Sequence, residues 1–141
     1  MKRIAKLSFF YSMLGLFLGA FYREFTKMNG FTGKTVLSGL HPHVLVLGAV
    51  FFLIVLLLEK SFELTKNKNF NKFFIIYNIG LLLTVIMMAV RGCIEVLNLE
   101  ISTMIDSSIS GVAGLGHIII TIGFILFFLI LNNRIKDADN K

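Results

Sequence analysis

Long apolar runs, separated by short polar segments, divide the chain. The four longest occupy residues 7–22, 40–58, 73–97 and 109–131. A helix needs about 20 mainly apolar residues to cross the hydrocarbon core of a bilayer. Backbone polar groups in lipid must be bonded within the chain, and the runs lack the strict alternation of barrel strands. The pattern therefore predicts an all-α integral membrane protein, a single bundle of four transmembrane helices over residues 1–141.

Composition supports the same class. Hydrophobic residues make up 56% of the chain and charged residues 16%, against about 45–50% and about 25% in soluble domains. The single Cys93 cannot form a disulfide within the chain or a CxxC redox motif. No HExxH, GxSxG or phosphate-binding loop is present. We therefore identify no catalytic residues; whether this chain alone is an enzyme stays open, and a binding role is favoured.

The basic residues predict an orientation. One side of the expected bundle has ten of them: Lys2, Arg3, Lys6, Lys60, Lys66, Lys68, Lys72, Arg134, Lys136 and Lys141. The other side has Arg23, Lys27 and Lys34. Cytoplasmic segments are enriched in Lys and Arg, so both termini are expected in the cytoplasm of a bacterial cell, with the chain in its cytoplasmic membrane. This distribution also explains the net charge of +6 without a nucleic-acid partner.

The first apolar run permits two interpretations. Basic residues before it and Leu-Gly-Ala near its end resemble a secretory signal peptide. Gly15 and Gly19, in contrast, form a GxxxG pair, which allows membrane helices to pack closely. We expect a retained helix.

Three histidines are the main chemical feature. His41 and His43 open the second apolar run, and His117 lies near the start of the fourth. Ionisable groups inside a membrane are costly and usually functional. Spans two and four both run inward from the outer face in the predicted orientation. His43 and His117 should therefore reach a similar depth in the outer half of the bilayer.

Two imidazoles from different helices are what a b-type haem requires, with apolar surroundings and cations near its propionates. Arg91 and Arg23 lie at the expected outer ends of spans three and one. Arg91 has an equally good partner in Glu95 one turn later, and Arg23 in Glu24. Small residues near the ligands would let a flat porphyrin approach the backbone: Gly48, Gly114 and Gly116.

The choice between His41 and His43 stays open. Residues two apart on a helix point about 200° away from each other, so both cannot face one iron. Pro42 is best tolerated in a first helical turn. This favours His43 as ligand, with His41 at the mouth of the site or on a propionate.

Other uses of the histidines are possible. Zinc could be held by His41, His43 and His117, although catalytic zinc sites need three well-spaced ligands. A cofactor-free accessory subunit would use the histidines in interhelical hydrogen bonds and the GxxxG face for a partner. A small metal or solute transporter is disfavoured because no acidic residue lies in the middle of a span.

Several segments together resemble a known family: Tyr-Arg-Glu-Phe-Thr-Lys (22–27), Leu-His-Pro-His-Val-Leu-Val-Leu-Gly (40–48), Tyr-Asn-Ile-Gly-Leu (77–81), Val-Arg-Gly (90–92) and Gly-Val-Ala-Gly-Leu-Gly-His (111–117). They are similar to small bacterial four-span membrane proteins catalogued as a domain of unknown function. More distantly, His-x-His-x-x-x-x-Gly resembles the haem-ligand segments of haem-copper oxidases and nitric oxide reductases.

The distant resemblance implies a low-spin haem near the outer face, with His43 (or His41) and His117 as axial ligands and Arg91 near a propionate. The further histidines of a copper centre are missing, so oxygen reduction is not implied. We expect a bis-histidine haem b protein that acts in electron transfer or in redox or gas sensing. Its expected partners are the lipid bilayer, a quinone or other membrane redox partner, and further copies of itself.

Overall fold

The computed structural model describes residues 1–140, and every regular element in that range is helical. Four helices are long and apolar enough to cross a membrane: Lys2–Met28, Val36–Phe62, Phe70–Val96 and Thr103–Asp139. The prediction of an all-helical chain with four helices of membrane-spanning length and composition is confirmed. Each helix extends past the apolar run that predicted it at one end or both, because polar turns continue the helix.

The second spanning helix is not uniform. It consists of the 3₁₀ turn η1 (Val36–Gly39), the α-helical turn α2 (Leu40–His43), the π-helical segment η2 (Val44–Val50) and the helix α3 (Phe51–Phe62). The other spans are α1 (Lys2–Met28), α4 (Phe70–Val96) and α5 (Thr103–Asp139), and a short turn η3 (Leu64–Lys66) joins α3 to α4.

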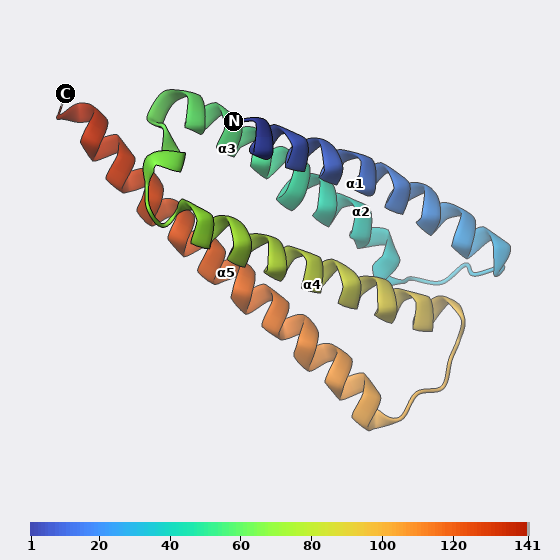
Figure 1. The fold of residues 1–141 in the computed structure, drawn as a ribbon. Helices are drawn as coiled ribbons and strands as arrows, with labels where there is room; N and C mark the ends of the chain where they lie inside the picture. The colour runs from blue at the N-terminus through green and yellow to red at the C-terminus, as the bar shows by residue number, and fades with distance from the viewer. Residues whose placement is uncertain (141) are drawn as a thin grey trace.

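Figure 1 shows how the spans are arranged. The second span packs along α1, and α5 packs mainly on α4. Both ends of the chain lie at the same end of the bundle, and α5 diverges from α1 and α2 toward the opposite end. The second span and α5 run in the same direction (Figure 1).

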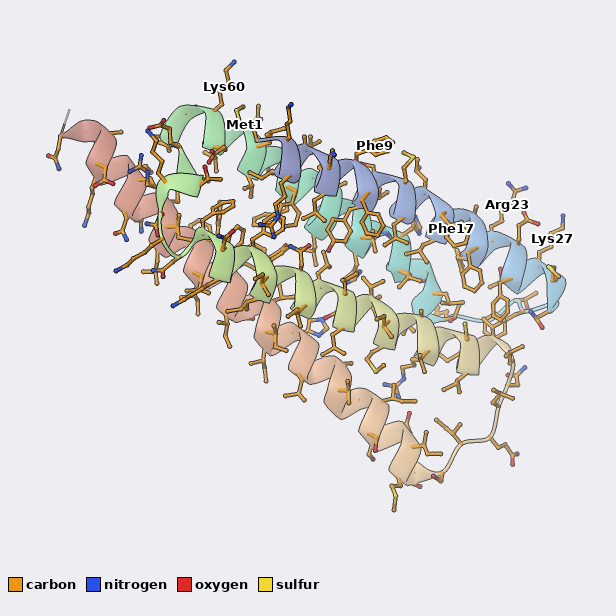
Figure 2. The ribbon with its side chains drawn as sticks, viewed as in Figure 1. Met1, Phe9, Phe17, Arg23, Lys27 and Lys60 are labelled. Atoms are coloured by element: carbon orange, nitrogen blue, oxygen red, sulfur yellow. The ribbon has the colours of Figure 1, made fainter. Side chains whose placement is uncertain are left out.

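Charged side chains lie toward the ends of α1, and apolar side chains lie between them. On α1, Figure 2 shows Met1 at one end, Arg23 and Lys27 at the other, and Phe9 and Phe17 between them. The exposed fractions of Phe9 and Phe17 are 66% and 65%. Large apolar side chains exposed between charged ends are expected where lipid is the solvent.

Aromatic rings join three of the spans. Phe51 on α3 stacks on Tyr77 of α4 with ring centroids 4.5 Å apart. The same ring meets Phe124 and Phe127 of α5 edge to face, at 5.1 Å and 5.2 Å. Such aromatic pairs are worth about 0.5–1.5 kcal/mol beyond their area of burial. This cluster fixes the height of the second span relative to α5.

Glycines permit the close helix contacts. A β-carbon added at Gly80 would lie 2.6 Å from the backbone nitrogen of Ile120, so α4 and α5 touch through their backbones. A β-carbon at Gly15 would lie 2.5 Å from the Leu45 side chain. Gly15 and Gly19 thus pack α1 against the second span, and the GxxxG face is covered within the chain.

Candidate cofactor site between the second span and α5

His43 and His117 lie at similar distances along their helices from one shared aromatic contact. Phe51 and Phe124 are in contact, and these residues come eight positions after His43 and seven after His117, respectively. At about 1.5 Å per residue, each histidine lies roughly 10–12 Å along its helix from the aromatic contact. Because the two spans run in the same direction (Figure 1), the two histidines lie on the same side of the aromatic contact and at similar distances from it.

His117 is on the side of α5 that faces the second span. Seven residues of regular helix bring a side chain back to within about 20° of the same face. Phe124, which shares that face, contacts Phe51 of α3 and Tyr77 of α4. The His117 side chain itself is exposed, since α5 has diverged from the second span at this height (Figure 1).

The π-helical segment η2 determines which histidine faces α5. In a regular α-helix, eight residues would leave His43 about 80° from the face of Phe51. A π turn accommodates roughly one extra residue and reduces that angle to about 20°. His41, two positions earlier, is then on the opposite side. Its ring lies against α1, where a β-carbon added at Gly19 would be 3.6 Å from His41 Cγ.

Side chains from two other spans bond to η2. The Ser8 hydroxyl on α1 donates a hydrogen bond of 2.8 Å to the carbonyl oxygen of Ala49. The Tyr77 hydroxyl on α4 donates one of 2.9 Å to the carbonyl oxygen of Leu47. Carbonyls displaced from the regular ladder need such donors inside a membrane. Tertiary contacts therefore stabilise the π turn.

His43 and His117 have the same hydrogen-bonding pattern. His43 Nδ1 lies 2.7 Å from the Gly39 carbonyl oxygen, and His117 Nδ1 lies 2.9 Å from that of Ala113. A carbonyl only accepts, so Nδ1 is inferred to be protonated, which leaves Nε2 with a free lone pair. Neither Nε2 has a hydrogen-bond partner within residues 1–140. This is the tautomer in which imidazole binds a metal through Nε2.

His41 differs in this respect. Its Nδ1 is buried and has no hydrogen-bond partner in the part of the chain that the structure describes. The angular estimates put His43 and His117 on the facing sides of the second span and α5, on either side of the gap between these diverging helices, whereas His41 lies against α1. No group of three His, Cys, Asp or Glu residues within residues 1–140 is arranged to hold a metal ion.

His43 borders an open and mostly apolar cavity on the second span. A cavity of about 300 Å³ is lined by Pro42, His43, Val46 and Leu47. A β-carbon at Gly39 would lie 3.4 Å from Met88 Cε and 3.8 Å from His43 Nδ1, so Met88 of α4 borders the same place. On α5, a β-carbon at Gly114 would meet no atom within 4 Å.

Two of the glycines expected beside the cofactor lie elsewhere. A β-carbon at Gly48 would be 2.5 Å from Tyr11 Cγ of α1, and one at Gly116 would be 2.5 Å from Thr84 Oγ1 of α4. These glycines allow helices to touch, and only Gly114 retains the free surface that the prediction requires.

Arg91 has a different partner from the one expected along its own helix. Its guanidinium pairs with Asp106 at 2.5 Å and donates to Ser110 Oγ at 2.9 Å, both on α5. Glu95 instead accepts the backbone N–H of Val36 at 2.8 Å. The N-terminal part of α5 therefore supplies both acceptors for Arg91, which the separation along the sequence could not indicate.

Arg23 forms an exposed pair with Glu24 at 3.5 Å, at the end of α1. This is the interfacial alternative considered for it. Exposed pairs of this kind contribute little to stability.

Sequence reasoning missed the residues that shape the gap. Ser8, Tyr77 and Asp106 act through contacts with distant parts of the chain, at separations of 41, 30 and 15 residues. The only local signal was Pro42, which marks the start of a helix but not the π turn that follows it.

A family model described as "Protein of unknown function (DUF2871)" matches residues 1–134. The chain belongs to this family. The match extends over all three histidines, and it confirms the resemblance to an uncharacterised family. No curated protein and no solved structure matches the chain. The more distant resemblance of this DUF2871 protein to haem-copper oxidases stays a hypothesis.

Proposed function

We propose that this DUF2871 protein binds one b-type haem between the second span and α5, with His43 and His117 as axial ligands. One observation supports this above the others. The two imidazoles lie at similar distances from the Phe51–Phe124 contact on spans that run in the same direction, and both keep Nε2 free because Nδ1 is bonded to the carbonyl of the preceding turn. His41 faces α1 and is not part of the ligand pair.

A haem iron with two imidazole ligands exchanges single electrons and has no open position for a substrate. The role proposed for the protein is therefore electron transfer or redox sensing, or gas sensing in which a gas would displace one imidazole. The bonds from His43 to Gly39 and from His117 to Ala113 restrain ring rotation and increase the basicity of Nε2. Met88 and Leu47 supply an apolar boundary.

Arg91 is the proposed propionate partner. A guanidinium has five N–H groups, and Arg91 uses two of its nitrogens on Asp106 and Ser110. Donors remain for a second carboxylate, and charge-assisted bonds of this type are about twice as strong as neutral ones.

The optical spectrum of the detergent-purified protein is the direct test. We expect a red protein whose reduced form has the sharp bands of a six-coordinate low-spin haem. His43→Ala and His117→Ala should each abolish that spectrum, while His41→Ala should keep it. A preparation that stays colourless after haem is supplied contradicts the proposal, and bound zinc without haem would support the metal alternative.

A cofactor-free accessory protein is the second candidate. The observation that favours it is the open surface of α5 around Gly111 and Gly114, where an added β-carbon meets no atom within 4 Å. A helix of a partner protein would cover this surface. The candidate predicts a colourless protein that co-purifies with a membrane partner whose binding is lost in Gly111→Leu.

The proposed setting is the bacterial cytoplasmic membrane, with both termini in the cytoplasm. The support is that basic residues are concentrated at the end of the bundle that contains the termini. The gap between His43 and His117 would then lie in the outer half of the bilayer, where a quinone, another membrane redox protein or a second copy of the chain would exchange electrons. Reporter fusions at either terminus test the orientation.

A further inference from the structure

A groove lies between α1 and α4 at the end of the bundle that contains the N-terminus. Its volume is about 330 Å³. Arg3 lies at one end, Leu7 and Phe10 line it from α1, and Ile75, Ile79 and Leu82 line it from α4. None of these residues belongs to the gap between His43 and His117, so what binds here is independent of the haem proposal.

Arg3 is oriented over the entrance of this α1–α4 groove. Its guanidinium carbon lies 4.0 Å above the centroid of the Phe74 ring, and Nη1 donates a hydrogen bond of 3.3 Å to Asn71 Oδ1. The stacked guanidinium has further N–H groups without a partner in residues 1–140. Such a fork suits the oxygens of a phosphate.

The charged residues that α1 and α4 contribute around the groove are all basic. Lys72 precedes Ile79 by seven residues and shares its face of α4, within about 20°. Lys6 precedes Phe10 by one turn on α1. No acidic residue occurs on α1 before Glu24 or on α4 before Glu95. The entrance therefore favours an anion.

The rest of the groove is apolar and has the length of one lipid leaflet. From Asn71 to Leu82 is eleven residues, or about 16 Å of helix, and half of a hydrocarbon core is about 15 Å. Ile75 and Ile79 are 52% and 53% exposed along it. An acyl chain fits such a surface.

A quinone head group fits less well. The Tyr11 hydroxyl already donates to Asn78 Oδ1 at 2.6 Å, and Asn78 Nδ2 donates to the Phe74 carbonyl at 2.6 Å. The Tyr11 hydroxyl therefore has no free donor for the carbonyl oxygens of a quinone, and Asn78 Nδ2 retains one N–H. The polar groups inside the groove thus offer a single N–H, whereas those at its entrance are cationic and match an anion better.

We propose that the α1–α4 groove binds an anionic phospholipid, with its phosphate on Arg3 between Lys6 and Lys72 and an acyl chain along Ile75, Ile79 and Leu82. Basic pockets between transmembrane helices bind anionic head groups in this way, and each basic contact adds measurably to the affinity.

Native mass spectrometry and thermal unfolding of the detergent-purified protein test this site. The full chain is measured with added phosphatidylglycerol and, separately, with phosphatidylcholine of the same acyl chains. We expect one phosphatidylglycerol to be retained per chain and to raise the midpoint of unfolding, with little effect from phosphatidylcholine. Arg3→Gln should lower retention about fivefold. Arg23→Gln, which removes a charge at the other end of α1, should not.

A second variant examines the acyl chain. Ile79→Trp fills the groove without changing its charge and should reduce retention with wild-type stability of the lipid-free protein. Equal retention of the two lipids, equal loss in Arg23→Gln, unchanged retention in Ile79→Trp, or equal stabilisation by inorganic phosphate would each overturn the proposal. Circular dichroism confirms that every variant is folded, and the haem spectrum is recorded separately.

Discussion

The hydroxyl of Tyr77, on α4, donates a hydrogen bond of 2.9 Å to the carbonyl oxygen of Leu47 in the π-helical segment. The ring of Tyr77 also stacks on Phe51, one turn further along the same span. The Tyr77 side chain thus contacts both the π turn, which orients His43, and Phe51, whose aromatic contacts fix the height of the second span relative to α5.

Tyr77→Phe should loosen this arrangement while it keeps the stacking on Phe51. Loss of one buried hydrogen bond costs about 0.5–1.5 kcal/mol, so the midpoint of thermal unfolding in detergent should fall. If haem is bound, its low-spin fraction should also fall as His43 becomes less well oriented. Tyr22→Phe is the matched control, and its stability should equal that of the wild type. Equal stability of both variants would contradict the role given to Tyr77.

A one-residue deletion tests whether the π turn sets the orientation of His43. Removing Val46 shortens the separation of His43 and Phe51 from eight positions to seven, which an α-helix places about 20° apart. Axial ligation should therefore survive. Removing Ile122, between His117 and Phe124, should rotate His117 by about 100° and abolish the low-spin spectrum. Loss of the spectrum in the Val46 deletion alone would show that the angular argument is wrong.

Arg91→Gln should weaken haem binding about tenfold or more, because charge-assisted hydrogen bonds contribute about 1.5–3 kcal/mol. Asp106→Asn should retain binding, since it removes the competing carboxylate and leaves the guanidinium. The pair is partly exposed, with side-chain exposures of 36% and 49%, so both variants should change stability by less than about 1 kcal/mol. Haem titration checks the affinities. An equal loss in both variants would assign Arg91 to holding α5 in place.

Substitution of different glycines by alanine should destabilise the protein to very different extents. Gly48→Ala inserts a β-carbon 2.5 Å from Tyr11 and should cost about 1–3 kcal/mol through overpacking. Gly114→Ala meets no atom within 4 Å and should leave the cofactor-free protein unchanged. Thermal unfolding of both variants is the measurement. Comparable destabilisation would mean that Gly114 is covered by another chain.

The sequence by itself determined the four spanning helices, since runs of apolar residues near bilayer length leave few other structures for a chain in lipid. It also singled out His43 and His117, because an imidazole within an apolar run needs a reason to be there. It left the choice between His41 and His43 open, and it expected Gly48 and Gly116 beside the cofactor.

Tertiary structure decided which side chains meet. The π turn in η2 rotates His43 toward α5 and His41 toward α1, and it depends on Ser8 and Tyr77, which are 41 and 30 residues from the carbonyls they bond. Likewise, Arg91 pairs with Asp106 and not with Glu95 because α5 packs on α4. Local periodicity assumes about 100° per residue. A single turn that departs from this value, held by distant donors, changes the face of every residue before it.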